Sequence, residues 1–332
     1  MIYDCFVFFN EIQLLRLRLA ELSPVVERFV LVEATRSFTG HPKPLHFDNN
    51  RHLFEEHLEK ICHIVVDDLP AKYESAWDME AHQRNAILRG LTEANPDDII
   101  AISDVDEIPR ASVLRSFQGT FSALELSHFY YRLNCRDLAS KWIASLLSRR
   151  SHLTTPQEAR MVASQFWKHG TPIIRDAGWH FSCMQDAAGL KLKLESFSHQ
   201  EYNTPQLTDV DSIGDKIKYG LDLVDRRDHS WCCVPLDNTF PACLLEHQGE
   251  FAHLLFDFAE FHQNRQALIY SLSDELQKAN QTIAELKGHV LQITQEFQHV
   301  RASKSWKLTE PLRTVARIAR RLSSRAQPPV EK

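Results

Sequence analysis

The first hundred residues alternate between short apolar runs and segments with helical periodicity, and this alternation restricts the folds that are available. The apolar runs are residues 5–9, 28–34, 63–69 and 99–103, and the helical segments between them are 11–22, 52–61 and 77–91. Four strands alternating with three helices predict an α/β fold, with a parallel, Rossmann-type sheet covered on both faces. The pattern loosens after about residue 120, where we expect an α+β continuation of the same domain, which would span residues 1–260.

Polar side chains gather where the predicted strands end. In open α/β sheets, ligands bind beyond the carboxyl ends of the strands. The residues at these ends are Asn10, Glu11, Glu33, Thr35, Asp67, Asp68, Asp104 and Asp106. The sequence therefore predicts a polar binding site along one rim of the sheet.

The fourth predicted strand runs directly into a cluster of acids in the stretch IIAISDVDEIP, residues 99–109. Asp104, Asp106 and Glu107 repel one another, and burying them is costly unless a cation or hydrogen-bond donors compensate. Paired carboxylates suit Mg²⁺ or Mn²⁺, ions that also bind substrate phosphates. Phosphatases of the haloacid dehalogenase type also place D-x-D after a strand, but their motif continues D-x-D-x-[TV], and here that position is Ile108.

A second D-x-D pair occurs in the stretch TDVDSIG, at Asp209 and Asp211. A chain of this length contains about one such pair by chance, so the surroundings have to distinguish the two. No apolar run precedes Asp209, and we interpret this pair as a turn or a helix cap.

Composition excludes several classes of protein. The net charge of -6 gives no reason to expect a nucleic-acid-binding protein. The seven cysteines are an odd number without a CxxC, which indicates reduced thiols and neither a disulfide framework nor a cysteine zinc site. The first residues lack the features of a signal peptide, and no run of about 18 apolar residues occurs, so we expect a cytoplasmic location.

The C-terminal segment, from residue 262 onwards, has a different pattern. Apolar residues recur at alternating spacings of three and four at Ile269, Leu272, Leu276, Ala279, Ile283, Leu286, Val290, Ile293, Phe297 and Val300. This heptad register predicts a coiled coil over 262–300, most simply a homodimer; the alternative is a single amphipathic helix lying on the domain. Residues 301–325 hold eight Lys or Arg against Glu310, and we expect a basic amphipathic tail over 301–332. Such a tail suits an anionic membrane surface, or is simply a solvated basic end.

Several of these stretches together resemble glycosyltransferase family 17. They are FFNEIQLLRLRLAEL, FVLVEATRSFTGHPKPLHF, SAWDMEAHQRNAI, IIAISDVDEIP, AGWHFS and KLKLESFSHQEYN, in order over roughly residues 3–203. The resemblance implies a GT-A-like, nucleotide-sugar-binding fold and inverting transfer of N-acetylglucosamine from UDP-GlcNAc to a glycan hydroxyl. It also implies a divalent metal, Mn²⁺ or Mg²⁺, with Asp104 and Asp106 as the metal and diphosphate ligands.

Further roles are assigned within this framework. Inversion by direct displacement needs a general base, for which Glu107 and Glu195 are the candidates. His180 and His199 are candidate third metal ligands, or else hydrogen-bonded structural histidines. Arg84 is expected to pair with the diphosphate, Asn10 and Glu33 to meet the uridine, and Trp179 to stack on a sugar ring; an exposed Arg84 and a core Trp179 are the alternatives.

The acceptor and the donor sugar remain open. The family's Golgi enzymes have a membrane anchor and stem that we do not find here, whereas the C-terminal segment resembles appendages of bacterial polysaccharide glycosyltransferases. We therefore expect a lipid-linked or surface-polysaccharide acceptor, met by a cytoplasmic enzyme peripheral to the inner membrane face. The alternatives are another nucleotide sugar on the same fold, or a non-catalytic scaffold that works through its coiled coil.

Overall fold

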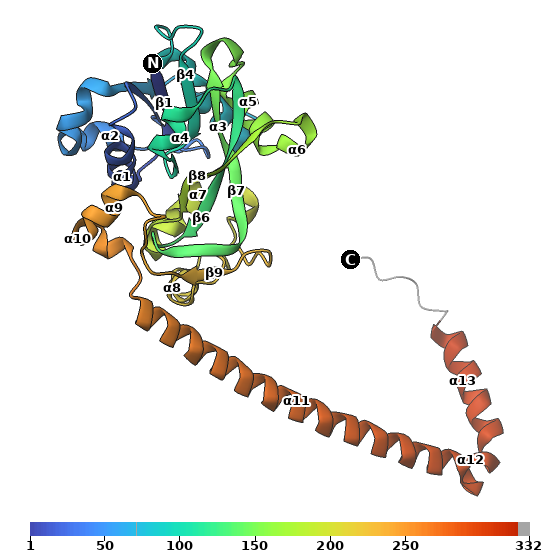
Figure 1. The fold of residues 1–332 in the computed structure, drawn as a ribbon. Helices are drawn as coiled ribbons and strands as arrows, with labels where there is room; N and C mark the ends of the chain where they lie inside the picture. The colour runs from blue at the N-terminus through green and yellow to red at the C-terminus, as the bar shows by residue number, and fades with distance from the viewer. Residues whose placement is uncertain (71, 325–332) are drawn as a thin grey trace. The chain divides into compact units, whose positions relative to one another are not determined.

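A computed structural model describes residues 1–70 and 72–324 (Figure 1), with side chains described as far as residue 320. The chain forms two compact units, the first covering Met1–Arg265 and the second starting at Gln266. No helix in the described ranges combines the length and the apolar character that crossing a membrane requires.

The first unit is built on the parallel sheet that the sequence predicts. Its strands β1 (Ile2–Phe8), β2 (Arg28–Ala34), β3 (Ile61–Val66) and β4 (Ile99–Asp104) lie in the order β3-β2-β1-β4, and every neighbouring pair among them is parallel. Side chains alternate between the faces, so Phe6 and Phe8 join one core cluster while Tyr3 and Cys5 join another. Both faces are therefore buried, as a parallel sheet requires.

Helical segments connect these strands, close to the predicted positions. They are α1 (Ile12–Leu22), α2 (His46–Asn49), the 3₁₀ segment Arg51–Lys60, α3 (Ala76–Asn85) and the 3₁₀ segment Ala86–Gly90. The segment 52–61 is helical as predicted, but it is a 3₁₀ segment, and non-helical backbone angles at Phe54 interrupt it. The apolar residues of α1 pack on one face of the sheet, and Met79 of α3 packs on the other.

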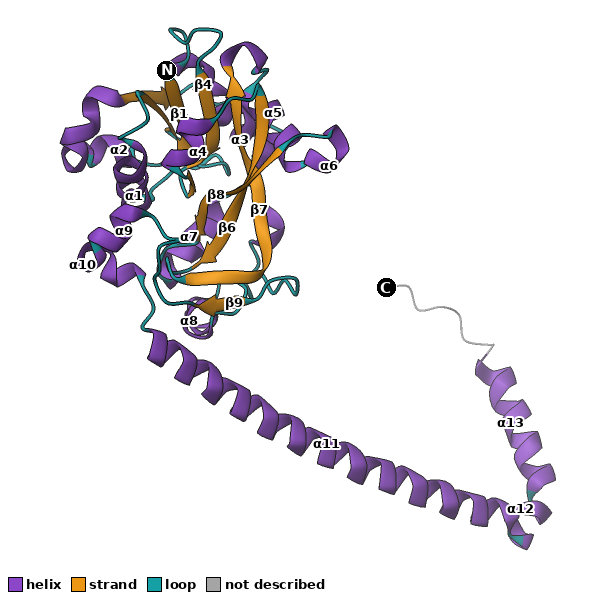
Figure 2. Cartoon of the chain, viewed as in Figure 1, coloured by secondary structure: helices purple, strands orange, loops and turns teal. Residues whose placement is uncertain are grey.

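A mostly antiparallel extension follows β4 and produces a mixed sheet (Figure 2). From β4 the order continues through β7 (Cys135–Arg149), β6 (Phe121–Tyr130), β8 (Ile173–Ser182) and β5 (Glu107–Pro109), while β9 (Trp231–Cys233) pairs with the far end of β7. Within this extension β6 and β8 are paired in parallel. Shorter helices surround it: α4 (Ala111–Ser116), α5 (Pro156–Ser164), α6 (Phe166–His169), α7 (Ala187–Ser196), α8 (Val210–Tyr219), α9 (Ala242–Glu246) and α10 (Gln248–Phe251). The expectation of an α/β sheet continued by α+β structure is confirmed at this level.

The second D-x-D pair caps a helix. Asp209 is the N-cap of α8, where its Oδ1 accepts the backbone N–H of Ser212 at 2.8 Å. Asp211 follows in the first turn, where a negative charge is favoured by the helix dipole. The interpretation of this pair as a cap is confirmed.

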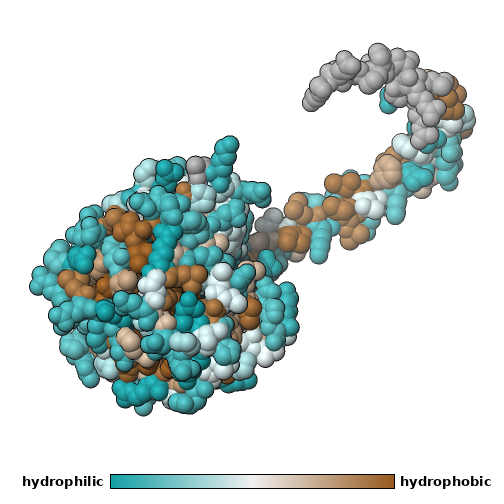
Figure 3. All heavy atoms as spheres, turned by 90° about the horizontal axis from the view of Figure 1, so that it is seen from above, coloured by the Kyte–Doolittle hydropathy of each residue, from teal (hydrophilic) through white to brown (hydrophobic). Residues whose placement is uncertain are grey.

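The long helix α11 (Phe258–Ala302) begins inside the first unit, where Phe261 is buried. The heptad residues from Ile269 to Val300 lie on the continuation of this helix, and their apolar side chains are exposed. Brown patches mark apolar residues along the helix (Figure 3). The basic segment is not one helix, because Ser303 caps α12 (Lys304–Leu308) and α13 (Glu310–Ser324) starts afresh next to Pro311.

Candidate active site

A cavity of about 610 Å³ opens in the first unit at the carboxyl ends of β1 and β4. Its charged lining residues are Glu11, Arg36, Lys43, Glu80, Arg84, Asp104, Asp106, Glu107, Arg160, Lys193 and Arg226. Aromatic residues complete the walls: Phe8, Phe9, Phe38, Trp77, Tyr130, Trp142, Phe197 and Tyr202. The cavity therefore offers charge and flat apolar surface together at the rim that the sequence predicts.

Two arginines hold Asp104 at the tip of β4. Arg84 of α3 donates to its Oδ1 at 3.0 Å, and Arg160 of α5 donates to its Oδ2 at 2.7 Å. Burial raises the pKa of Asp104, and the two guanidinium groups oppose this effect. Arg84 lines the cavity and is only 2% exposed, so the alternative of an exposed helix arginine is excluded. Its Nε has no hydrogen-bond partner among the described residues, and its expected pairing with a diphosphate stays a prediction.

Glu107 is the most heavily hydrogen-bonded carboxylate of the cluster. Arg160 donates to both of its oxygens, at 2.6 and 2.7 Å, and the indole N–H of Trp142 donates at 2.7 Å. Ser145 and the backbone N–H of Asp104 also donate to it. Burial opposes ionisation, yet Arg160 dominates the balance and holds the pKa of Glu107 far below its usual range. A carboxylate with five donors and such a low pKa is suited to organising the site and poorly suited to accepting a proton.

Asp106 is buried without a hydrogen bond to its carboxylate from any described residue. It is 8% exposed, and the side-chain nitrogens nearest to its carboxylate are His180 Nε2 at 3.7 Å and Lys193 Nζ at 3.9 Å. Burial alone would raise its pKa, but these two neighbours hold the pKa of Asp106 below its usual value. An ionised, buried and unsatisfied carboxylate is the arrangement expected of a cation ligand.

His180 completes this group from β8. Candidate ligand atoms of Asp106, Glu107 and His180 lie within 4.8 Å of one another, and all three residues are buried. His180 Nδ1 is buried and has no hydrogen-bond partner in the described part of the chain. Oxygen ligands with one imidazole suit Mn²⁺ or Mg²⁺, so Asp106 and His180 fit a divalent metal. Asp104 lies outside the group.

Trp179 points away from the cavity. Successive residues of a strand face opposite sides, so the placement of His180 in the cavity puts Trp179 on the other face of β8. There it is 2% exposed, donates to the carbonyl of Thr239 at 2.9 Å, and lies beneath Arg110. The expected sugar-stacking role is wrong in geometry, and Trp179 is a core residue.

His199 lies at the edge of the cavity but outside the metal-competent group. Its Nδ1 pairs with Glu201 at 2.7 Å, and its ring contacts Trp77 edge-on at 4.5 Å. Glu195, the second candidate base, belongs to α7 but is not among the lining residues. The structure therefore brings His180 to the acids and leaves His199 and Glu195 apart from them.

Asn10 and Glu33 support the rim from behind. Glu33 is fully buried and accepts the backbone N–H groups of His46 and Phe47, which fixes the loop after β2. Lys43 reaches Glu33 at 3.5 Å and itself lines the cavity. Asn10 accepts a hydrogen bond from Gln185 at 3.0 Å. Neither Asn10 nor Glu33 lines the cavity, so direct contact with a uridine is not what this geometry favours.

The sequence patterns do not point to Arg160, Lys193 and Trp142, and they place Glu11 at a strand end without giving it a role. Glu11 follows β1, and its Oε2 accepts the backbone N–H groups of Phe9 and Asn10 at 3.2 and 3.0 Å. Burial raises its pKa, and its Oε1 has no hydrogen bond from a described residue. Its position at a strand end was a usable signal. Arg160 lies in α5, between β7 and β8, where no local pattern points to the acids.

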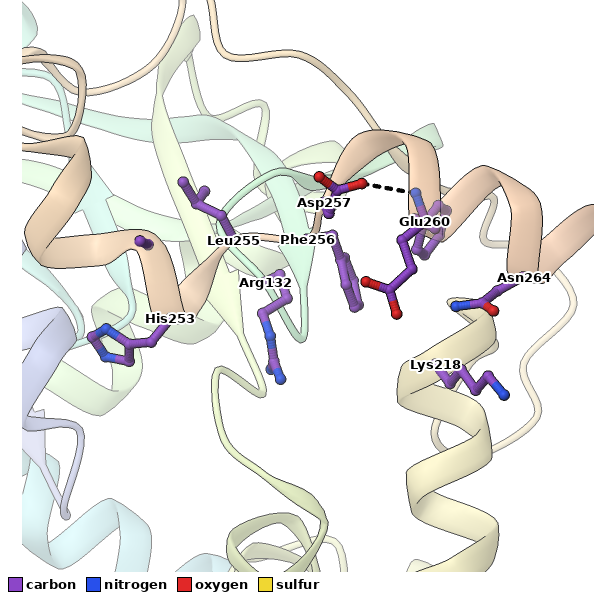
Figure 4. A pocket seen from close by; sticks show the side chains of 10 residues that line it. Arg132, Lys218, His253, Leu255, Phe256, Asp257, Glu260 and Asn264 are labelled. Atoms are coloured by element: carbon purple, nitrogen blue, oxygen red, sulfur yellow. Dashed lines mark hydrogen bonds between the residues drawn. The ribbon is translucent and has the colours of Figure 1, made fainter.

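A second, smaller pocket of about 270 Å³ lies around the start of α11 (Figure 4). Arg132, Lys218, Asp257 and Glu260 are among its lining residues. Asp257 points to the helix, where its carboxylate accepts the backbone N–H of Glu260 at 2.8 Å (Figure 4). This contact is a helix cap, and no cluster of candidate metal ligands occurs here within the described ranges.

A sheet that carries a charged cavity at the carboxyl ends of its parallel strands is typical of enzymes that bind phosphate-containing ligands. The family comparison is more specific. The profile of glycosyltransferase family 17 matches residues 1–234, and the chain belongs to that family. The resemblance found in the sequence motifs is thereby confirmed.

Individual relatives agree with the family. Beta-1,4-mannosyl-glycoprotein 4-beta-N-acetylglucosaminyltransferase of Homo sapiens is 25% identical over 309 residues, covering 83% of this chain and 55% of that protein. The Rattus norvegicus protein of the same name is 25% identical over 286 residues, covering 76% and 52%. The chain thus spans about half the length of these relatives. A solved structure, Francisella tularensis 2-C-methyl-D-erythritol 4-phosphate cytidylyltransferase, reaches a TM-score of 0.32 at 9% identity over 59% of this chain and 100% of that one, which is too low to carry an argument.

Proposed function

We propose that this chain transfers N-acetylglucosamine from UDP-GlcNAc to a hydroxyl of a glycan acceptor, with inversion and with a divalent metal, Mn²⁺ or Mg²⁺. The observation that carries the proposal is Asp106, a buried and ionised carboxylate without a hydrogen bond from any described residue. Family membership supports glycosyl transfer, and the names of the relatives support the donor sugar.

The metal would be held by Asp106 and His180, where it supplies positive charge to the diphosphate of the donor and its departing form. Arg84, Lys43 and Lys193 line the same cavity and offer further cationic contacts to phosphate oxygens. Asp104 and Glu107, linked through Arg160, fix this arrangement. Binding the diphosphate would also satisfy the free Nε of Arg84.

Glu11 is the carboxylate best suited to act as general base. Its Oε1 is free of hydrogen bonds from described residues, and burial raises its pKa towards the range in which a base both accepts and releases a proton. In the proposed step Glu11 takes the proton of the acceptor hydroxyl while that oxygen attacks the anomeric carbon. The bond from that carbon to the diphosphate breaks, and UDP leaves with the bonding electron pair. Glu107 and Glu195 do not fit this role, for the reasons of geometry given above.

We further propose that the chain is a homodimer through residues 269–300 and contacts an anionic membrane through its basic tail. Nine of the heptad residues are large apolar side chains that are 47–64% exposed in the single chain, which is the surface a partner helix would cover. In α13 the apolar residues Leu312, Val315 and Ile318 lie among arginines. A lipid-linked glycan at the inner membrane face would then be the acceptor, met by a cytoplasmic enzyme.

Thermal-shift measurements test the donor assignment. We expect UDP-GlcNAc with Mn²⁺ to raise the melting temperature, UDP with Mn²⁺ to do so less, and both effects to vanish when the metal is chelated. GDP serves as the control nucleotide, and UDP-Glc serves as the control sugar. A larger shift with UDP-Glc would assign another nucleotide sugar to the same fold, and no shift with any nucleotide would favour a non-catalytic scaffold.

A further inference from the structure

A second group of candidate metal ligands lies beside the proposed active site. It consists of His128 on β6, Asp137 on β7 and His229 just before β9, and one ligand atom from each lies within 4.8 Å of the other two. The three segments are neighbours in the sheet, since β7 pairs with both β6 and β9. Sequence analysis did not select these residues, because about a hundred residues separate the first from the last.

Asp137 is held as an oriented anion. It is 2% exposed, and its Oδ1 accepts the backbone N–H groups of Ala139 and Ser230, both at 2.9 Å. These bonds leave Oδ2 facing His229 Nδ1 at 2.5 Å, with the Ser140 hydroxyl also at 2.5 Å. Burial opposes ionisation, but these donors hold the pKa of Asp137 well below its usual range. The backbone therefore presents one carboxylate oxygen to the histidine.

His128 has an unsatisfied nitrogen. The side chain is 2% exposed, and its Nε2 is buried with no hydrogen-bond partner in the described part of the chain. Its neighbours are aromatic rings: it stacks on His180 at 4.6 Å and meets Trp231 edge-on at 4.8 Å. Burial, followed by the nearby His180 and His229, lowers the pKa of His128 well below its ordinary value.

We propose that His128, Asp137 and His229 bind a divalent metal ion of the zinc class. Two imidazoles and one carboxylate are a donor set that Zn²⁺ prefers, with a fourth position for water or the Ser140 hydroxyl. The ion takes the place of the proton shared by Asp137 and His229, and it gives the buried nitrogen of His128 a partner. The backbone bonds to Asp137 Oδ1 are the outer contacts that orient such a ligand.

A metal ion at this site would hold one wall of the active-site cavity in place. Leu223, Val224 and Arg226 line the cavity and lie in the segment that leads to His229 and β9. An ion shared by His128, Asp137 and His229 ties that segment to β6 and β7. The proposal does not depend on the transferase activity, because the ion holds a wall in place without taking part in the reaction.

The test uses the full chain, purified without a histidine tag and dialysed against a chelator. After reloading with Zn²⁺ and removal of excess metal, mass spectrometry of the metal content should find one zinc per chain. The His229→Ala and Asp137→Asn variants should lose that zinc, whereas His152→Ala, which changes an exposed histidine elsewhere, should keep it. Asp106→Asn should also keep it, because Asp106 belongs to the neighbouring group.

Two further measurements keep the test decisive if a variant folds poorly. Zn²⁺ at a hundredfold excess over its Kd should raise the melting temperature of the chelator-treated wild type by at least about 5 °C. Co²⁺ in place of Zn²⁺ should give the visible absorption of a four-coordinate ion. A wild-type chain without bound zinc or thermal shift would overturn the proposal and leave Asp137 and His229 as a hydrogen-bonded pair. Zinc retained by folded His229→Ala would overturn it too.

Discussion

Replacing Asp106 by asparagine should reduce activity strongly while changing the stability of the fold little, so it tests the proposed metal site directly. Asparagine keeps the shape of the side chain and removes its charge. The nitrogens nearest to the Asp106 carboxylate are His180 Nε2 at 3.7 Å and Lys193 Nζ at 3.9 Å, and the carboxylate takes no hydrogen bond from a described residue. The change therefore removes electrostatic interactions without breaking a hydrogen-bond network.

The cost in stability is expected to be small. At an effective dielectric constant near 20, the Lys193 ammonium attracts the carboxylate by roughly 4 kcal/mol, but burying the charge offsets most of this attraction. The net balance favours the anion, since the pKa of Asp106 is lowered despite burial. We expect the variant to lose about 1 kcal/mol of unfolding free energy, the usual scale of a single substitution.

The cost in activity is expected to be much larger. Loss of one essential electrostatic contact to the reacting charge reduces the rate at least ~100-fold, which is about 2.7 kcal/mol of transition-state stabilisation. The assay measures UDP release from UDP-GlcNAc over a range of Mn²⁺ concentrations, with urea unfolding of the same preparations. The concentration of Mn²⁺ for half-maximal activity should rise strongly in the variant.

Asp209→Asn is the matched control, because the second D-x-D has the same local sequence pattern but caps α8. Asparagine is as good an N-cap as aspartate, so stability and transfer should both stay close to wild type. If Asp106→Asn retained wild-type transfer and Mn²⁺ dependence, or if Asp209→Asn were the inactive variant, the assignment of the metal ligand would be wrong.

Three further outcomes follow from the same structure. Arg160→Met should lower the unfolding free energy by about 3–5 kcal/mol in urea titrations, because Asp104 and Glu107 would lose their shared partner inside the protein; unchanged stability would contradict this. Burial raises the pKa of Glu11, so transfer should fall as pH drops through that raised pKa. The stability that protonated Glu11 provides should be lost as pH rises through the same pKa. Glu11→Gln should abolish transfer and remove this pH dependence of stability, and a Gln variant with full activity would exclude the base role. Truncation after Arg265 should convert a dimer to a monomer that still turns over the donor but no longer sediments with anionic vesicles. Light scattering measures the oligomeric state, and vesicle sedimentation at low and high salt measures membrane binding. A full-length chain that is a monomer would refute the coiled coil.

The truncation is placed after Arg265 because the first turns of α11 belong to the first unit, which the heptad periodicity does not show. The pattern locates one helix correctly, but it does not show that the helix begins in the first unit. Phe261 is buried among the third core cluster, and Arg265 donates to the carbonyl of Trp231. A cut after residue 260 or 261 would therefore remove part of the domain itself. The periodicity describes the surface of a helix, whereas burial of its first turns depends on residues distant in sequence.

The parallel strands were predictable because each is a short apolar run and helical segments separate one run from the next. The same reasoning located the acids at the tip of β4, since a strand end fixes where the next side chains emerge. It predicted 52–61 to be helical, and that segment is helical but of the 3₁₀ type. Local pattern specifies that a segment is helical more reliably than it specifies its hydrogen-bond geometry.

The roles within the acid cluster depend on partners from other parts of the chain. Asp104, Asp106 and Glu107 look alike in the sequence, yet Arg160 satisfies Glu107, two arginines hold Asp104, and Asp106 alone is left without a hydrogen bond from the described residues. Arg160 comes from α5, more than fifty residues away, on the far side of the β6–β7 hairpin. Side chains of β8 alternate between the two faces of the sheet, so His180 lies in the cavity and Trp179 lies in the core. The sequence does not show which face of β8 borders the cavity, so it could not distinguish these two residues. The sequence identifies which residues can carry the charge, and the fold decides which of them remains free to bind a ligand.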